Sequence, residues 1–112
     1  MPSGDDLRKI ALSLPSAEER ETWGHATFRV RDKIFVTMSD DGAGASVKAT
    51  MDEQAALIAE DPETFSVPAY VGRHGWVGVD VGRIGLDQLR ELVTEAWRMT
   101  APKRTVRAFD AG

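Results

Sequence analysis

Three short runs of alternating apolar and polar side chains, between residues 27 and 49, restrict the fold of this chain most strongly. Alternation with a period of two residues is typical of β-strands that bury one face. The runs cover residues 27–31, 33–39 and 45–49, and the turn sequences Arg31-Asp32-Lys33 and Asp40-Asp41-Gly42 separate them. Because connections this short cannot join parallel strands, the region predicts an antiparallel meander.

The same alternation predicts which side chains face the core. In the first run Phe28 and Val30 face inward, which directs Arg29 and Arg31 outward. In the second run the residues expected on the inner face are Ile34, Val36 and Met38. A fourth strand is expected at residues 76–81, with Val77, Val79 and Val81 facing inward, and Phe65 and Val67 suggest a short fifth strand.

Helical periodicity replaces the alternation in three other segments. Residues 5–14 repeat apolar side chains at i, i+3, i+4 and i+7 and are followed by Pro15, which ends the predicted helix. Thr50 and Glu53 match a capping box, which predicts a helix from there to about Glu60. Residues 86–100 carry the longest apolar stripe, which consists of Leu86, Leu89, Leu92, Val93, Ala96 and Trp97.

These elements predict an α+β fold in the order helix, three strands, helix, two strands, helix. We expect a two-layer sandwich in which helices cover one face of a mostly antiparallel five-stranded sheet, while the other face stays partly open. Residues 16–24 are interpreted as a polar connection, and residues 101–112 as a short basic tail after Pro102. The 112 residues are 42% hydrophobic, which suffices for one core, so a single domain is expected over residues 1–112.

Composition excludes several kinds of site. The chain has no cysteine, so disulfides, thiolate chemistry and cysteine-based zinc sites are excluded. No apolar run approaches the roughly 18 residues that a membrane span needs. The first residues place acids before their apolar stretch, unlike a signal peptide, so we expect a cytoplasmic protein without a membrane partner. The net charge of −4 opposes nonspecific DNA binding unless cations gather locally.

Five short sequence motifs occur along the chain, and their shared order is more specific than any one of them alone. They are WGHATFRVRDKIF at residues 23–35, VK at 47–48, EDPETF at 60–65, PAYVGRHGWV at 68–77 and APKR at 101–104. Together they resemble the MmcQ/YjbR family, although Asp32 stands where that family often has Gly and Ala26 where it often has Pro. The resemblance implies a fold similar to that of type III secretion chaperones, with a five-stranded antiparallel sheet, and it implies DNA binding.

Two groups of cations are the candidate phosphate contacts. The first group is expected on the open face of the sheet, at its hairpin tip and in the glycine-rich loop, and consists of Arg29, Arg31, Lys33, Lys48 and Arg73. The second group lies at the C-terminus and consists of Lys103, Arg104 and Arg107, near Arg98 and the aromatic Trp97 and Phe109. The alternative interpretations are a solvated sheet face, with Asp80 pairing one arginine, and a C-terminal segment that docks on the sheet.

The sequence contains no set of residues typical of an enzyme. His25 and His74 have no partner at ligand spacing, the Glu18, Glu19 and Glu21 cluster is interpreted as solvated, and the loop at residues 72–76 matches no nucleotide-binding pattern. We therefore expect no catalytic residues, no metal and no cofactor. No recognition helix with outward basic residues is evident, so base-specific reading is not expected.

A protein partner is the main alternative to DNA. An exposed apolar patch formed by Phe35, Tyr70 or Trp76 would favour a chaperone-like interaction module. The expected assembly is a monomer or a weak homodimer.

Overall fold

The computed structural model describes residues 2–22 and 24–112; Met1 and Trp23, the first residue of the long motif, lie outside the described residues. The elements are α1 (Gly4–Ser13), β1 (Ala17–Thr22), β2 (His25–Val30), β3 (Lys33–Met38), β4 (Gly44–Val47), α2 (Met51–Glu60), β5 (Phe65–Ser66), η1 (Gly72–His74), β6 (Val77–Asp80), α3 (Leu86–Thr100) and α4 (Lys103–Ala111). One antiparallel sheet contains the strands in the order β1-β2-β3-β4-β6-β5. The α+β architecture is confirmed.

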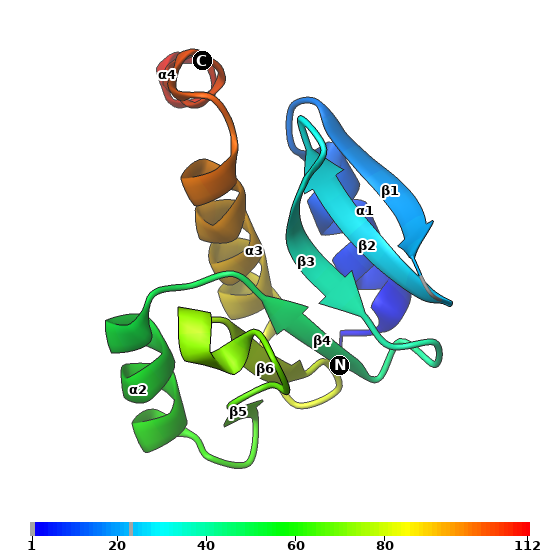
Figure 1. Cartoon of the computed structure of the whole chain (residues 1–112), viewed down its shortest axis with the longest axis vertical. Coiled ribbons are helices and arrows are strands. Elements are labelled where there is room, and N and C mark those ends of the chain that lie inside the picture. The colour runs from blue at the N-terminus through cyan, green and yellow to red at the C-terminus, as the bar shows by residue number, and fades with distance from the viewer. Residues whose placement is uncertain (1, 23) are drawn as a thin grey trace.

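Helices α1 and α3 lie against one face of the sheet (Figure 1). The core between these layers contains the predicted inward residues Phe28, Val30, Val77, Val79 and Val81, together with the buried stripe of α3. Trp97 is fully buried, and its Nε1–H donates a hydrogen bond of 3.0 Å to the Pro15 carbonyl oxygen. Of the predicted α3 stripe, only Leu86 is exposed, because it is the first residue of the helix.

Helices α1 and α2 both begin at residues whose side chains cap the first turn. Ser3 caps α1, with its hydroxyl accepting from the Asp6 amide and the Asp6 carboxylate accepting from the Ser3 amide. The predicted cap of α2 is confirmed, since the Thr50 hydroxyl accepts from the Glu53 amide at 3.1 Å. Within the described chain, no helix is both long and apolar enough to cross a membrane.

The polar connection predicted at residues 16–24 was wrong, because Ala17–Thr22 forms the edge strand β1. This strand pairs with β2 from Ala17 opposite Val30 to Thr22 opposite His25. Its four central side chains are all exposed, so the sequence shows no apolar alternation there. Backbone pairing with β2 forms the strand without side-chain burial, and the sheet has six strands rather than the expected five.

A β-bulge changes the predicted orientation of β3. The pairing shifts between Phe28, opposite Val36, and Arg29, opposite Ile34, so Phe35 is the extra residue. Phe35 and Val36 are both buried as a result, whereas Ile34 shares the open face with Arg29. The predicted inward placement is confirmed for Val36 and Met38 but was wrong for Ile34.

The C-terminal segment is a helix rather than a tail. Residues Lys103–Ala111 form α4, which docks on the end of α3. The Phe109 ring meets Trp97 edge to face, with centroids 5.0 Å apart and an interplanar angle of 62°. Beside this contact Arg98 pairs with Asp110 at 2.6 Å. No residue of α4 is fully buried, and its apolar contacts come from Val106, which packs against the core, and from Phe109.

Candidate nucleic-acid interface

The structure brings cations from both predicted groups to one hollow. Arg31, Lys33 and Lys103 line a cavity of about 530 Å³ between the β2–β3 turn and the linker from α3 to α4. Residues 99–102 form the rest of its wall. Figure 1 shows the turn and the linker at the same end of the molecule. We call this hollow the basic groove, defined by Arg31, Lys33 and Lys103.

The β2–β3 turn presents its cations through an unusual backbone conformation. Arg31 and Asp32 both adopt positive φ angles, 54° and 66°, between the paired residues Val30 and Lys33. A two-residue turn of this kind matches the right-handed twist of the strands that it joins. The Asp32 carboxylate reaches back to Arg20 at 3.0 Å and forms its ion pair there rather than with Arg31 or Lys33.

The start of α4 adds positive charge to the basic groove. The residue before the helix is Pro102, which offers no side chain to cap the first amides. Those amides form the positive end of the helix dipole, next to the Lys103 ammonium. Arg104 and Arg107 extend the exposed basic surface along α4.

Arg98, which the sequence groups with these cations, has a different role. Its guanidinium lies 3.0 Å from the Glu95 carboxylate and 2.6 Å from that of Asp110, and it covers the Phe109 ring at 5.5 Å. These contacts fix α4 on α3. Arg98 therefore positions the helix that carries Lys103 and does not face the groove as a free cation.

The eight predicted phosphate contacts all lack an ion pair with a carboxylate of the described residues. Among the described residues, ion pairs with carboxylates involve Arg8, Arg20, Arg83, Arg90 and Arg98. None of the eight predicted contacts belongs to that set. Asp80, the partner considered for a sheet arginine, instead accepts a hydrogen bond from the Gly82 amide at 3.1 Å. The eight cations therefore remain available to anions despite the net negative charge.

Five of the eight predicted contacts do not line the basic groove: Arg104 and Arg107 lie along α4, and Arg29, Lys48 and Arg73 lie elsewhere. Arg29 is on the open face, where its guanidinium donates to Thr22 Oγ1 at 2.8 Å and to Thr27 Oγ1 at 3.2 Å. Lys48 follows β4, and its amide donates to the Phe35 carbonyl at 3.0 Å. Arg73 is exposed in η1, the turn whose Gly72 carbonyl accepts a hydrogen bond from Gln54 of α2.

The glycine-rich loop that holds Arg73 is fastened to α2. The buried side chain of Gln54 donates from Nε2 to the carbonyls of Gly72 and Trp76, at 2.7 and 2.6 Å. The interpretation of these glycines as a turn into a strand is therefore supported by their contacts. Sequence reasoning did not identify Gln54. The only signal for it was that α2 contains a single glutamine and buries little else.

Carboxyl groups with shifted pKa values lie outside the groove. The Ala43 amide, with the Ser39 hydroxyl, lowers the pKa of Asp41, and the Thr64 hydroxyl lowers the pKa of Asp61. The Ser3 amide lowers the pKa of Asp6 in the α1 cap. These carboxylates stabilise turns and caps. In the described part of the chain, no three His, Asp or Glu side chains gather as a metal site would require.

Comparisons with known proteins agree on the fold. The sequence model of the YjbR family matches residues 12–99, a segment that ends before α4. Uncharacterised proteins of Mycobacterium bovis and Mycobacterium tuberculosis are 35% identical over 78 residues, or 70% of this chain and 53% of theirs, so the chain spans about half the length of these relatives. A crystal structure of a Deinococcus radiodurans protein with a DUF419 domain superposes with a TM-score of 0.79 at 21% identity, over 88% of this chain and 78% of that one.

Proposed function

Given that this chain belongs to the YjbR family, we propose that it is a non-enzymatic protein that binds DNA through phosphate contacts in the basic groove. One observation carries the proposal: Arg31, Lys33 and Lys103, from segments far apart in sequence, line one hollow without carboxylate partners. Lysine and arginine contacts with phosphates release condensed counterions, and this release is the main source of nonspecific affinity for DNA.

The distribution of charge defines the side from which DNA approaches. The acids of α2, among them Asp52, Glu53 and Glu60, lie at the opposite end of the molecule from α4 in Figure 1. A phosphate backbone at the basic groove thus meets Lys103, Arg104 and Arg107 while it avoids that acidic helix. A local potential of this kind acts even when the whole chain is acidic.

Helix α4 also changes the expected mode of contact. The sequence analysis treated residues 101–112 as a tail, whereas Arg104 and Arg107 are exposed on a helix, α4. Spaced three residues apart, they lie on one side of the helix. In the proposed complex they extend the phosphate contacts that begin at Lys103.

Replacing both groove lysines, Lys33→Ala with Lys103→Ala, is expected to weaken duplex DNA binding roughly tenfold to a hundredfold at about 0.1 M salt. The slope of log affinity against log salt should become shallower by about two, since two phosphate contacts are lost. Fluorescence-anisotropy titration of a labelled duplex at several salt concentrations measures both quantities.

The matched control is Lys9→Ala with Arg90→Ala, which removes the same two charges from exposed positions on α1 and α3. This control should leave the salt slope near that of the wild type. If both double variants lost DNA affinity equally, the effect would come from the change in net charge and not from the groove. Absence of binding by the wild-type protein at low salt would refute the proposal.

One observation favours the alternative of a protein-interaction module. Tyr70 is 90% exposed in the loop after β5 and adopts a positive φ of 63°, close to the exposed Val67. The patch expected from the sequence does not form as a whole, since Phe35 is fully buried and Trp76 is half-buried. A Tyr70→Ser variant that keeps DNA binding but loses a protein partner would support this second function.

A further inference from the structure

The open face of the sheet holds a second hollow, distinct from the basic groove. It has a volume of about 380 Å³, near the lower end of the roughly 300–1,000 Å³ range of small-molecule sites. Ile34 is the apolar side chain on the open face that lines it, whereas Met38 and Ala45 border the hollow but are buried on the core side. Ile34 reaches this face because of the β-bulge in β3, so the bulge creates part of the hollow.

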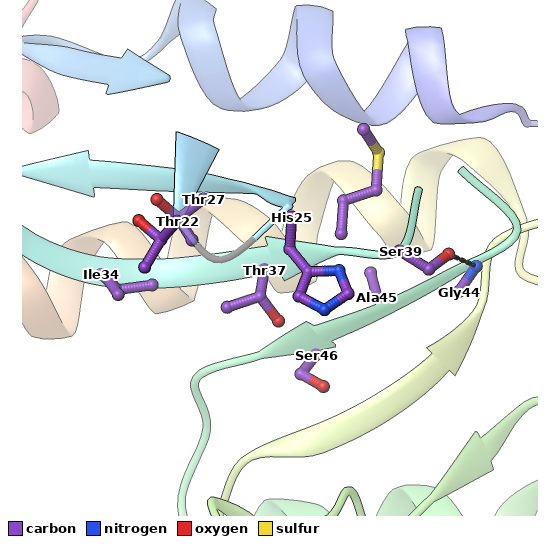
Figure 2. Close-up of a pocket in the computed structure, with 10 residues that line it drawn as sticks. Thr22, His25, Thr27, Ile34, Thr37, Ser39, Gly44, Ala45 and Ser46 are labelled. Carbon is purple, nitrogen blue, oxygen red and sulfur yellow. Dashed lines mark hydrogen bonds between the residues drawn. The ribbon is translucent and has the colours of Figure 1, made fainter. Parts of the chain in front are cut away.

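Polar groups without protein partners converge on the same hollow (Figure 2). Thr37 and Ser46 are opposite each other on β3 and β4, and neither hydroxyl forms a hydrogen bond with another described residue. The His25 ring lies over the hollow near Thr37 in Figure 2. Its Nδ1 is 3.4 Å from Asp40 Oδ1, and its other ring nitrogen, Nε2, can exchange a hydrogen bond with a ligand.

Arg29 supplies a positioned cation at the rim of the hollow. Its guanidinium donates to Thr22 Oγ1 and Thr27 Oγ1, and both threonines line the hollow. A longer contact of 3.5 Å joins it to the Asp32 carbonyl. A guanidinium has five N–H groups, so two remain for a ligand. Neutral oxygens hold Arg29 in place, and its charge is not compensated by a carboxylate among the described residues.

We propose that this hollow binds a small organic anion of the nucleoside monophosphate class. The phosphate pairs with Arg29, and the planar base covers the apolar side chain of Ile34 next to Thr37. Base and ribose donors and acceptors meet Thr37, Ser46 and His25. The inference goes beyond the proposed DNA contact, because it uses none of the three residues that line the basic groove.

The test is a titration of ¹⁵N-labelled protein followed by NMR, with adenosine monophosphate, adenosine and inorganic phosphate as separate probes. Adenosine monophosphate should shift the amides of Thr27, Thr37 and Ser46 and bind roughly tenfold or more tightly than adenosine, which lacks the anion. Inorganic phosphate lacks the base, so it should bind the hollow more weakly than the nucleotide. Equal affinity for adenosine and its monophosphate, or no shifts at millimolar nucleotide, would overturn the proposal.

Two variants locate the binding. Arg29→Gln should weaken adenosine monophosphate binding roughly tenfold or more, and Thr37→Val roughly threefold to tenfold, because the second variant keeps the side-chain shape and removes only the hydroxyl. The groove variant Lys33→Ala with Lys103→Ala should leave nucleotide affinity unchanged. If only the groove variant weakens nucleotide binding, the nucleotide does not bind in the hollow on the open face. Since DNA binding is measured separately, either proposal can fail while the other stands.

Discussion

Replacing Trp97 by alanine is expected to lower the free energy of unfolding by about 3–5 kcal/mol, the usual effect of truncating a buried tryptophan. The Trp97 side chain is fully buried between α1 and the sheet, and it donates a hydrogen bond to Pro15. The variant also loses the ring on which Phe109 of α4 packs. Because domains of this size are stable by only about 5–15 kcal/mol, a urea titration should show a large shift of the midpoint.

The conservative variant Trp97→Phe separates packing from hydrogen bonding. It retains an aromatic ring for Phe109 and loses the Nε1–H donor, so it should cost less than the alanine variant, about 1–3 kcal/mol. Hydrogen exchange of the α4 amides should rise strongly in Trp97→Ala and only slightly in Trp97→Phe. Equal exchange in both variants would mean that the Trp97 ring does not anchor α4.

Replacing Gly75 by alanine is expected to destabilise the fold by about 2–5 kcal/mol. Gly75 adopts a φ of +94°, and a left-handed conformation costs other residues roughly 1–2 kcal/mol. A Cβ at this position would lie 2.7 Å from the carbonyl carbon of Thr50 and 2.8 Å from the amide nitrogen of Met51. Both are backbone atoms at the start of α2, so the clash can be relieved only if the helix shifts. This shift should destabilise the fold by roughly 1–3 kcal/mol more.

Gly24 offers the matched control for this prediction. It has a similar φ of +81°, but a Cβ there would meet no atom within 4 Å among the described residues beyond its chain neighbours. Gly24→Ala should therefore show only the conformational cost, and the difference between the two variants isolates the clash with α2. Equal shifts in denaturation midpoint would contradict the tight contact between the glycine-rich loop and the start of α2.

Elements that bury an apolar face could be predicted from the sequence. The stripe of α3 and the inward valines of β6 appear as periodic patterns, because burial selects the residue type at each position. Strand β1 and helix α4 could not be predicted in this way. Their side chains are mostly exposed, and contacts distant in sequence hold them: β2 pairs with β1, and Trp97 with Arg98 supports α4.

The candidate site was likewise predictable from the sequence only in part. Arg31 and Lys33 were identified from the strand alternation and the hairpin tip, and Lys103, Arg104 and Arg107 from a C-terminal segment without acids between Ala96 and Phe109. Their convergence depends on the direction of the β2–β3 turn and on the docking of α4, which no local pattern encodes. The hollow on the open face likewise depends on a bulge that alternation did not reveal, since one extra residue reverses the faces of its neighbours.

The sequence by itself determined the fold class, the cap of α2, the turn positions and most of the core, because local backbone preferences and burial periodicity act over a few residues. The tertiary structure alone decided the sixth strand, the outward side of Ile34 and the role of Arg98. It also decided which cations share a groove. Those features depend on pairings between distant segments, where the partner, rather than the residue's own neighbours in sequence, provides the stabilising contact.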